Sequence, residues 1–350
     1  MTADLMAVVL LLAVAAYACA GGTDYGAGFW DLLAGGAERG RRPRWLIDQA
    51  MAPVWEVNNV WLIFVFVIMW TGFPTLFQTV FSAMWLPLAL AAVGLVLRGA
   101  GFAFRKVVTR LAGRRLYGAV FALASLVTPF FLGAAAGGIA SGRVKVGTEA
   151  SADAWSNPTS VMFGLLAVAA TAFLGAVFLA ADARRFDAPD LVVHFRRRGL
   201  LSLAALMLLV AITLWITSDD APHVWHGLTH GAGLVLAVVA GAASFVTAWL
   251  LTRRPGGWVR ASAVAAVACA VIAWGLAQRP YLLPTSMTVA EGAGAPATLT
   301  WLAFVTLVAL LIVVPAVVFL YWLDTRGDLE ELTGADLRQG GGPQEGGDSL

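Results

Sequence analysis

The sequence predicts an all-α polytopic membrane protein with about nine transmembrane helices. Hydrophobic residues make up 60% of the 350 residues and charged residues only 13%, whereas soluble proteins carry roughly 25% charged residues. Apolar runs recur that reach the roughly 20 residues a helix needs to cross a hydrocarbon core about 30 Å thick. They do not alternate in short segments as membrane β-barrel strands do. A soluble fold is excluded, because the chain has too few charges to cover its surface.

Nine stretches are long and apolar enough to be spans. They are residues 5–33, 54–73, 79–97, 117–140, 160–181, 199–217, 227–251, 258–277 and 298–323. The first is polar in its second half. It follows no basic segment and has no convincing cleavage site, so we expect it to be a retained helix rather than a signal peptide. These stretches predict an integral membrane domain at 1–324. The Gly-, Glu- and Gln-rich residues 325–350 predict a disordered cytoplasmic tail.

The basic residues lie almost entirely in every second loop. Of 23 Lys and Arg residues, 20 fall after the first, third, fifth and seventh spans or in the tail. The opposite side holds only Arg143, Lys145 and Arg279. Because cytoplasmic loops retain positive charge, this alternation predicts the N-terminus outside and the C-terminus in the cytoplasm. The basic loops would then face the anionic inner leaflet, and no nucleic acid is needed to explain them.

Aromatic residues and one isolated histidine fit the same membrane interpretation. Several tryptophans, among them Trp30, Trp85 and Trp258, lie near span ends and are expected to anchor at the bilayer interface. Cys19 and Cys269 both fall within spans and form no disulfide framework or metal motif. His194 lies in a basic loop and is expected to be solvated.

Two carboxylates inside the spans are candidates for function, because an ionisable group in a bilayer is costly unless paired or hydrated. Asp24 lies among glycines that favour close helix approach, namely Gly21, Gly22, Gly26 and Gly28. Glu56 precedes Asn58 at the start of the second span, and Arg98 at the end of the third is the natural counter-ion for one of the acids. A buried acid–arginine pair could simply fix helix register. Alternatively, one of these acids conducts protons.

Three of the four histidines form a second cluster. His223, His226 and His230 follow i, i+3, i+7 spacing, and Asp219 and Asp220 lie just before them. A helix beginning near Pro222 would place all three imidazoles on one face at its outer end. Such a face could ligate a metal or an axial haem position. Otherwise the imidazoles hydrogen-bond to headgroups, neighbouring backbone or one another.

Several motifs occur together and in order along the chain. They are GGTDYGAG at 21–28, PVWEVNNVWL at 53–62, GFP at 72–74, LRGAGFAFR at 97–105 and YLLPTS at 281–286. Taken together they resemble subunit II of the cytochrome bd quinol oxidase family, and the first hundred residues are the most specific part.

That resemblance implies a nine-helix subunit built of two four-helix bundles plus a peripheral helix. It would pair as a heterodimer with a similarly folded subunit I, which carries haem b, haem d and the quinol site. The complex would lie in the bacterial cytoplasmic (inner) membrane, oxidise quinol and reduce O2 to water. Small accessory membrane subunits, and a structural quinone or lipid, are further possible components, and no cofactor is assigned to this chain itself.

The resemblance also assigns roles to individual residues. Asp24 matches the family's helix-1 acid, and Arg98 matches the arginine of its R-G motif. Glu56 matches the acid of the W-D-x-N motif, which is associated with proton uptake from the cytoplasm, and Asn58 would assist it. The family often has Asp where this chain has Glu56, and often an acid where this chain has Ala103.

Two other functions remain open on the residues alone. A proton-coupled secondary transporter would use Asp24 and Glu56 as coupling carboxylates, although no inverted repeat is visible. A haem-binding electron-transfer subunit would use the outer histidines.

Overall fold

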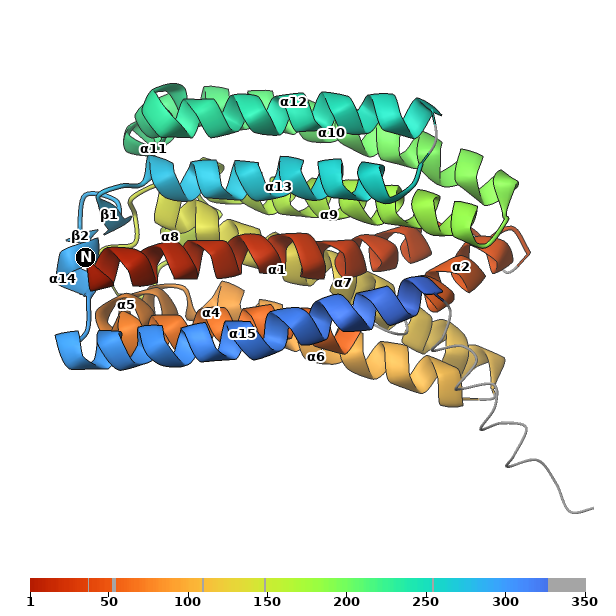
Figure 1. The fold of residues 1–350 in the computed structure, drawn as a ribbon, viewed down its shortest axis with the longest axis horizontal. Coiled ribbons are helices and arrows are strands. Elements are labelled where there is room, and N and C mark those ends of the chain that lie inside the picture. The colour runs from red at the N-terminus through yellow and green to blue at the C-terminus, as the bar shows by residue number, and fades with distance from the viewer. Residues whose placement is uncertain (37, 52–54, 109, 148, 254, 327–350) are drawn as a thin grey trace, which may run out of the picture. The chain divides into compact units, whose positions relative to one another are not determined.

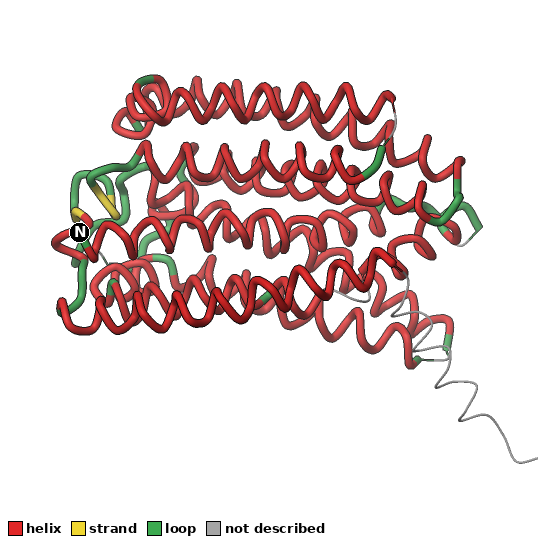
Figure 2. Tube along the Cα trace, in the orientation of Figure 1, coloured by secondary structure: helices red, strands yellow, loops and turns green. Residues whose placement is uncertain are grey.

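The computed structural model describes residues 1–36, 38–51, 55–108, 110–147, 149–253 and 255–326. Within these ranges it describes no side chain for residues 51, 55, 56, 106, 111, 114, 321, 322 and 324–326. Nearly every described residue is helical, apart from loops and a two-stranded antiparallel sheet, as Figure 2 shows. The predicted all-α class is confirmed.

Eight helices in the described part of the chain are long and apolar enough to cross a membrane. They are α1 (Thr2–Leu32), α6 (Trp85–Val107), α7 (Leu111–Ala140), α9 (Pro158–Arg185), α10 (Pro189–Asp220), α12 (Gly231–Arg253), α13 (Gly257–Ala277) and α15 (Pro296–Arg326). A ninth span is counted if the bent pair α4 (Val60–Gly72) and α5 (Pro74–Ala83) is one crossing.

The remaining elements are short. They are α2 (Arg41–Met51), α3 (Trp55–Asn58), α8 (Asp153–Ser156), α11 (Pro222–Thr229), β1 (Tyr281–Leu283), β2 (Met287–Thr288) and α14 (Val289–Gly292). The two strands form a hairpin in which Thr285 has a φ of 62°. Thr288 then caps α14: its Oγ1 accepts a hydrogen bond from the Glu291 N–H at 3.3 Å, and its own N–H donates to the Glu291 carboxylate at 2.8 Å, which lowers the pKa of that carboxyl.

The described helices of the unit Met1–Ala303 pack in two rings of four. The first contains α1, the α4–α5 pair, α6 and α7, and the second contains α9, α10, α12 and α13. Helix α1 also packs against α9 and α13, so it joins the rings, and Figure 1 shows it between them. This arrangement confirms the two bundles that the resemblance implied. The second unit begins at Phe304 and is described to Arg326, as an apolar helix with Pro315 inside it.

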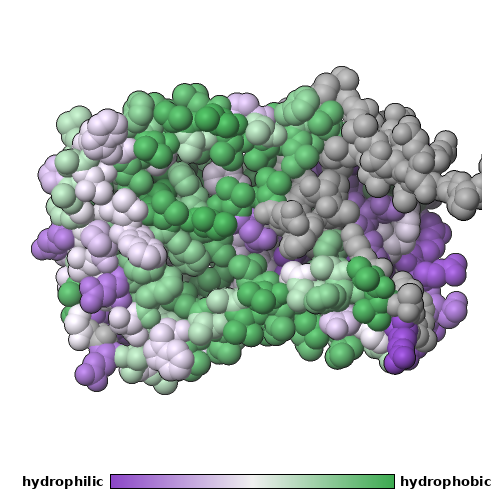
Figure 3. Space-filling model, turned by 90° about the horizontal axis from the view of Figure 1, so that it is seen from below, coloured by the Kyte–Doolittle hydropathy of each residue, from purple (hydrophilic) through white to green (hydrophobic). Residues whose placement is uncertain are grey.

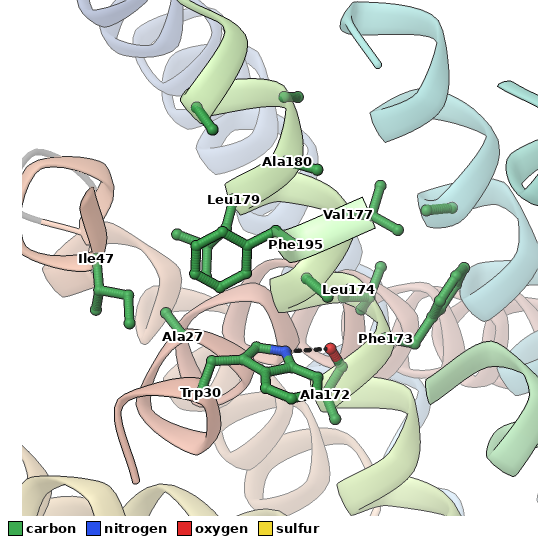
Figure 4. Packing of buried hydrophobic residues seen from close by; sticks show 14 of the residues in the cluster. Ala27, Trp30, Ile47, Ala172, Phe173, Leu174, Val177, Leu179, Ala180 and Phe195 are labelled. Carbon is green, nitrogen blue, oxygen red and sulfur yellow. Dashed lines mark hydrogen bonds between the residues drawn. The ribbon is translucent and has the colours of Figure 1, made fainter. Parts of the chain in front are cut away.

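Helix α9 carries the larger hydrophobic core. Phe173, Leu174 and Val177 on α9 are fully buried, and Figure 4 shows them beside Trp30 and Phe195. Trp30 is only 8% exposed, and its Nε1 donates to the carbonyl oxygen of Ala172 at 2.8 Å. The prediction that Trp30 anchors at the bilayer interface was therefore wrong, whereas Trp85 and Trp258 are exposed at helix starts as expected.

The pair α4–α5 is bent by 116° at Phe73, where the second predicted span, 54–73, ends. The third predicted span, 79–97, was drawn as one segment, but it begins inside α5 and continues into α6. Pro74 begins α5, where its missing N–H costs nothing because the first turn of a helix has no acceptor for it. The Gly72 carbonyl at the end of α4 accepts a hydrogen bond from the Gly294 N–H at 2.8 Å. Helix α4 has 13 residues and is therefore only about 20 Å long, which is shorter than a hydrocarbon core of about 30 Å.

Polar residues gather at the two ends of the helices and hydrophobic residues between them, on the face seen in Figure 3. One end, here called the arginine-rich end, holds the C-terminus of α1, α2, the C-terminus of α9 and the start of α10. The other, the hairpin end, holds the N-terminus, α11 and the β-hairpin.

The crossing of α1 and α9 predicts a stability difference between two glycine substitutions. A Cβ on Gly26 would lie 1.9 Å from the Thr171 carbonyl oxygen and 2.7 Å from the Gly175 Cα. Because backbone cannot move aside as a flexible side chain can, Gly26→Ala should destabilise the protein by about 1–3 kcal/mol. The measurement is thermal unfolding of the purified protein in detergent.

Gly241→Ala is the matched control, because nothing lies within 4 Å of a Cβ at that position of α12. There the better helix propensity of alanine should leave stability unchanged or raised by up to about 1 kcal/mol. Equal effects of the two substitutions would contradict the close α1–α9 contact.

Candidate functional site: a buried polar cluster on α1

Asp24 lies in the interior of the first ring and is 4% exposed. Its Oδ2 accepts a hydrogen bond from Nδ2 of Asn58, at 2.8 Å. Asn58 is the last residue of α3 and is 2% exposed. The structure thus brings together two residues that are 34 positions apart and that the sequence selected separately.

Arg98 on α6 completes the charge balance of this cluster. It is 2% exposed and is the cation that acts electrostatically on Asp24. Its Nε donates to Ser125 Oγ on α7 at 3.2 Å, and its guanidinium carbon lies 4.7 Å from the centre of the Tyr25 ring. Its Nη2 is buried and has no hydrogen-bond partner among the described residues. No ion pair within 4 Å joins Asp24 to Arg98 in the described chain. Arg98 therefore balances the charge of Asp24 from a longer distance, without a direct contact.

Small residues allow the helices to approach at this point. A Cβ on Gly28 would lie 2.1 Å from Ser125 Oγ, and one on Gly101 would lie 2.9 Å from the Tyr117 carbonyl oxygen. Glycine at both positions lets α1 and α6 lie directly against α7. The expectation that glycines around Asp24 permit close approach is confirmed.

Glu56 belongs to α3 by its backbone, two residues before Asn58. Its side chain lies outside the described part of the chain, so its role stays a prediction.

A tyrosine pair extends the polar cluster along α1. The hydroxyl groups of Tyr17 and Tyr25 are 2.8 Å apart, and the rings meet edge to face. Sequence reasoning missed both residues, because tyrosines in an apolar helix usually read as anchoring or packing residues.

Sequence reasoning also missed an ion network at the arginine-rich end. Asp31 is 4% exposed and accepts from Arg105 Nη1 at 2.7 Å and from Arg44 Nε at 3.0 Å. Arg105 also pairs with Asp48 of α2. Two acids and two arginines therefore join α1, α2 and α6. The available signal was Arg105, the last residue of the LRGAGFAFR motif.

The three predicted histidines do not share one helical face. Helix α11 ends at Thr229, and His230 is extended with φ −136° and ψ 158°. His223 Nε2 lies 3.2 Å from the Gln278 carbonyl oxygen, whereas the His226 and His230 rings stack 4.2 Å apart. No three His, Cys, Asp or Glu side chains in the described ranges are grouped so that they could hold a metal.

The structure engages two of the ring nitrogens of these histidines, and a haem role for them stays a prediction. Axial ligation needs an imidazole nitrogen free to bind the iron, with a pocket for the macrocycle around it. Here His223 is engaged with a backbone carbonyl, and the Nδ1 of His230 lies 3.0 Å from both the His226 carbonyl and Thr229 Oγ1.

The fold and the cluster together define a class: a multi-pass α-helical membrane subunit with a charge-balanced polar cluster inside its helices. The sequence matches the family described as "Cytochrome bd terminal oxidase subunit II" over residues 2–324. The chain belongs to this family, whose members are subunits of an oxidoreductase complex.

Individual relatives are similar to this chain, one over most of its length and one over about a third. The chain is 21% identical to subunit 2 of the cytochrome bd-I ubiquinol oxidase of Escherichia coli (strain K12), covering 91% of this chain and 93% of that protein. It is 30% identical over 112 residues to the cytochrome bd ubiquinol oxidase subunit 2 of Bacillus subtilis (strain 168), which is 32% of each. These identities mark it as a divergent member.

A solved structure shows the same fold. The chain resembles a chain of the bd oxidase from Geobacillus thermodenitrificans with a TM-score of 0.76 and 25% sequence identity. The match covers 92% of this chain and 98% of that one. These similarities imply that the chain works in a complex with another subunit.

The ion network predicts a clear difference between two arginine substitutions. Arg105→Gln leaves Asp31 buried with one of its two cations removed, so it should destabilise the protein by about 3–5 kcal/mol. Arg42→Gln breaks the exposed Arg42–Asp190 pair, at 3.0 Å, and should cost about 0–1 kcal/mol. Thermal unfolding in detergent compares them.

Adding Asp31→Asn to Arg105→Gln should recover part of the lost stability, because the buried carboxylate charge is removed together with its partner. Equal losses for the two arginine variants would show that the network contributes no more than a surface pair.

Proposed function

We propose that this chain is the non-haem subunit of a quinol:O2 oxidoreductase and that its buried polar cluster takes up protons from the cytoplasm. The protons would be consumed when O2 is reduced to water in the partner subunit. The observation that carries the proposal is the environment of Asp24, a fully buried acid bonded to the neutral amide of Asn58.

The two buried acids of α1 differ in a way that separates a structural role from a proton-carrying one. Asp31 is fixed by direct ion pairs with Arg44 and Arg105, and protonating it would leave two cations without their anion. Asp24 accepts only from Asn58 among the described residues, and Arg98 acts on it from a distance. A carboxylate bonded to a neutral donor can gain a proton without breaking an ion pair, so Asp24 suits proton transfer.

Proton delivery has a physical reason in such a complex. Negative charge on reduced oxygen species inside a low-dielectric protein is very costly unless a proton compensates it. An acid inside the membrane, near a cation that balances its charge, can be protonated transiently and then pass the proton on. Glu56 precedes Asn58 in α3 and would be the next acid of the path, as the family motif implies.

The same proposal includes the orientation of the subunit in the membrane and its partner. The arginine-rich end faces the cytoplasm, which places the N-terminus outside, in accordance with the charge bias of the loops. The partner is the haem-bearing subunit I, with haem b and haem d, in the bacterial inner membrane. Its quinol site and those haems lie outside this chain.

Substituting the two acids tests the proton path. Glu56→Leu and Asp24→Asn should each slow O2 consumption by roughly tenfold or more, equivalent to a barrier about 1.4 kcal/mol higher. Asp24→Asn preserves the size of the side chain and an acceptor for Asn58, so the complex should still assemble with its haems. The measurement is quinol-driven O2 uptake by the purified complex, normalised to haem content.

Glu149→Leu is the control, because Glu149 is an exposed loop acid away from the cluster, and turnover should be unchanged. Wild-type turnover in an intact Asp24→Asn and Glu56→Leu complex would refute the roles of both acids. Failure of the chain to copurify with a haem-bearing membrane partner would refute the oxidase assignment itself.

A further inference from the structure

A groove at the arginine-rich end combines cations with an apolar wall. It has a volume of about 550 Å³ and lies between the C-terminus of α1 and the first turns of α10. Arg197, Arg198 and His194 supply its polar side, and Leu33, Val193 and Leu201 belong to its apolar side. Figure 1 shows the start of α10 at the same end as α2 and the end of α1.

The polar side chains of the groove have few hydrogen-bond partners within the protein. Arg197 is exposed and makes no hydrogen bond or ion pair with any described residue. His194 is half-buried, and its Nε2 is buried and has no hydrogen-bond partner in the described ranges. Arg198 donates only a long bond, 3.4 Å, to the Leu33 carbonyl oxygen.

Neighbouring groups orient these donors without neutralising them. The Arg198 guanidinium stacks over the Trp30 ring at 5.3 Å, and that ring is fixed by the bond from Trp30 Nε1 to the Ala172 carbonyl oxygen, drawn in Figure 4. The one acid of the lining, Asp190, pairs with Arg42 at 3.0 Å. The groove therefore presents net positive charge.

The groove also lies at the depth where a bilayer changes from hydrocarbon to headgroups. Helix α10 has 32 residues, about 48 Å, which exceeds a hydrocarbon core of about 30 Å. Its apolar stretch begins at Gly199, directly after Arg198. Below the groove, Leu201, Leu208 and Trp215 are 69%, 62% and 74% exposed, and their seven-residue spacing places them on one face of the helix.

We propose that this groove binds one anionic phospholipid. The phosphodiester would accept hydrogen bonds from Arg197 and Arg198, and an acyl chain would lie along the apolar stripe of Leu201, Leu208 and Trp215. Guanidinium groups bind phosphate through parallel donors, and a neutral ligand such as a quinone would leave the positive charge uncompensated. The proposal does not depend on the proton path.

The test titrates the delipidated, partner-bound complex with phosphatidylglycerol in mixed micelles and measures bound lipid by native mass spectrometry. Arg197→Gln should weaken phosphatidylglycerol binding about fivefold, since one basic residue near an anionic surface contributes about 1 kcal/mol. Arg197→Gln/Arg198→Gln should weaken it further. Arg196→Gln is the matched control: it makes the same charge change on the same helix outside the groove, and binding should be unchanged.

Haem content and thermal unfolding without lipid should match the wild type in Arg197→Gln, because the side chain has no protein partner to lose. Equal binding by Arg197→Gln and Arg196→Gln would overturn the proposal. So would equal binding of phosphatidylcholine, saturation by inorganic phosphate at the same concentration, or displacement of phosphatidylglycerol by a short-chain quinone.

Discussion

Burial of two aspartates on one membrane-embedded helix is the constraint on which the first ring depends. Neither Asp24 nor Asp31 of α1 can stay charged in the interior without partners, because burying an unpaired carboxylate in a low-dielectric medium costs several kcal/mol or more, a large share of the roughly 5–15 kcal/mol by which a folded protein is stable. The partners come from other helices: Asn58 from α3, and Arg98 and Arg105 from α6. Register and spacing of these helices follow from those charges, and glycines at the crossings make the approach possible.

The two acids are balanced by different partners, and this difference separates a structural role for Asp31 from the proposed proton-carrying role of Asp24. Asp31 is enclosed by direct ion pairs at the arginine-rich end, a geometry that holds α1, α2 and α6 together. Asp24 has a neutral hydrogen-bond partner and a cation in electrostatic range. A scaffold held by fixed charges can thus carry one acid whose charge can change.

The sequence predicts what depends on composition and local pattern, and it fails where distant segments meet. Apolar length and charge alternation were enough for an all-α membrane fold, and the motifs selected Asp24, Asn58 and Arg98, which the structure brings together. The bend at Phe73 and the break before His230 were not predicted, because hydropathy averages over such interruptions. The pairing of Asp31 with Arg105 spans 74 residues, and no periodicity links residues so far apart. Asp31 lies near the end of the first predicted span, 5–33, and no local pattern marked it as a charged residue with a distant partner.

The central claim is that Asp24 changes its protonation during turnover whereas Asp31 does not. The most direct measurement follows proton uptake with a pH-indicator dye after the fully reduced complex reacts with O2, in Asp24→Asn and Asp31→Asn. The account predicts slowed uptake in Asp24→Asn, with O2 binding unaffected, and a wild-type uptake rate in the assembled Asp31→Asn complex. Unchanged uptake in Asp24→Asn, or equal slowing in both variants, would contradict it.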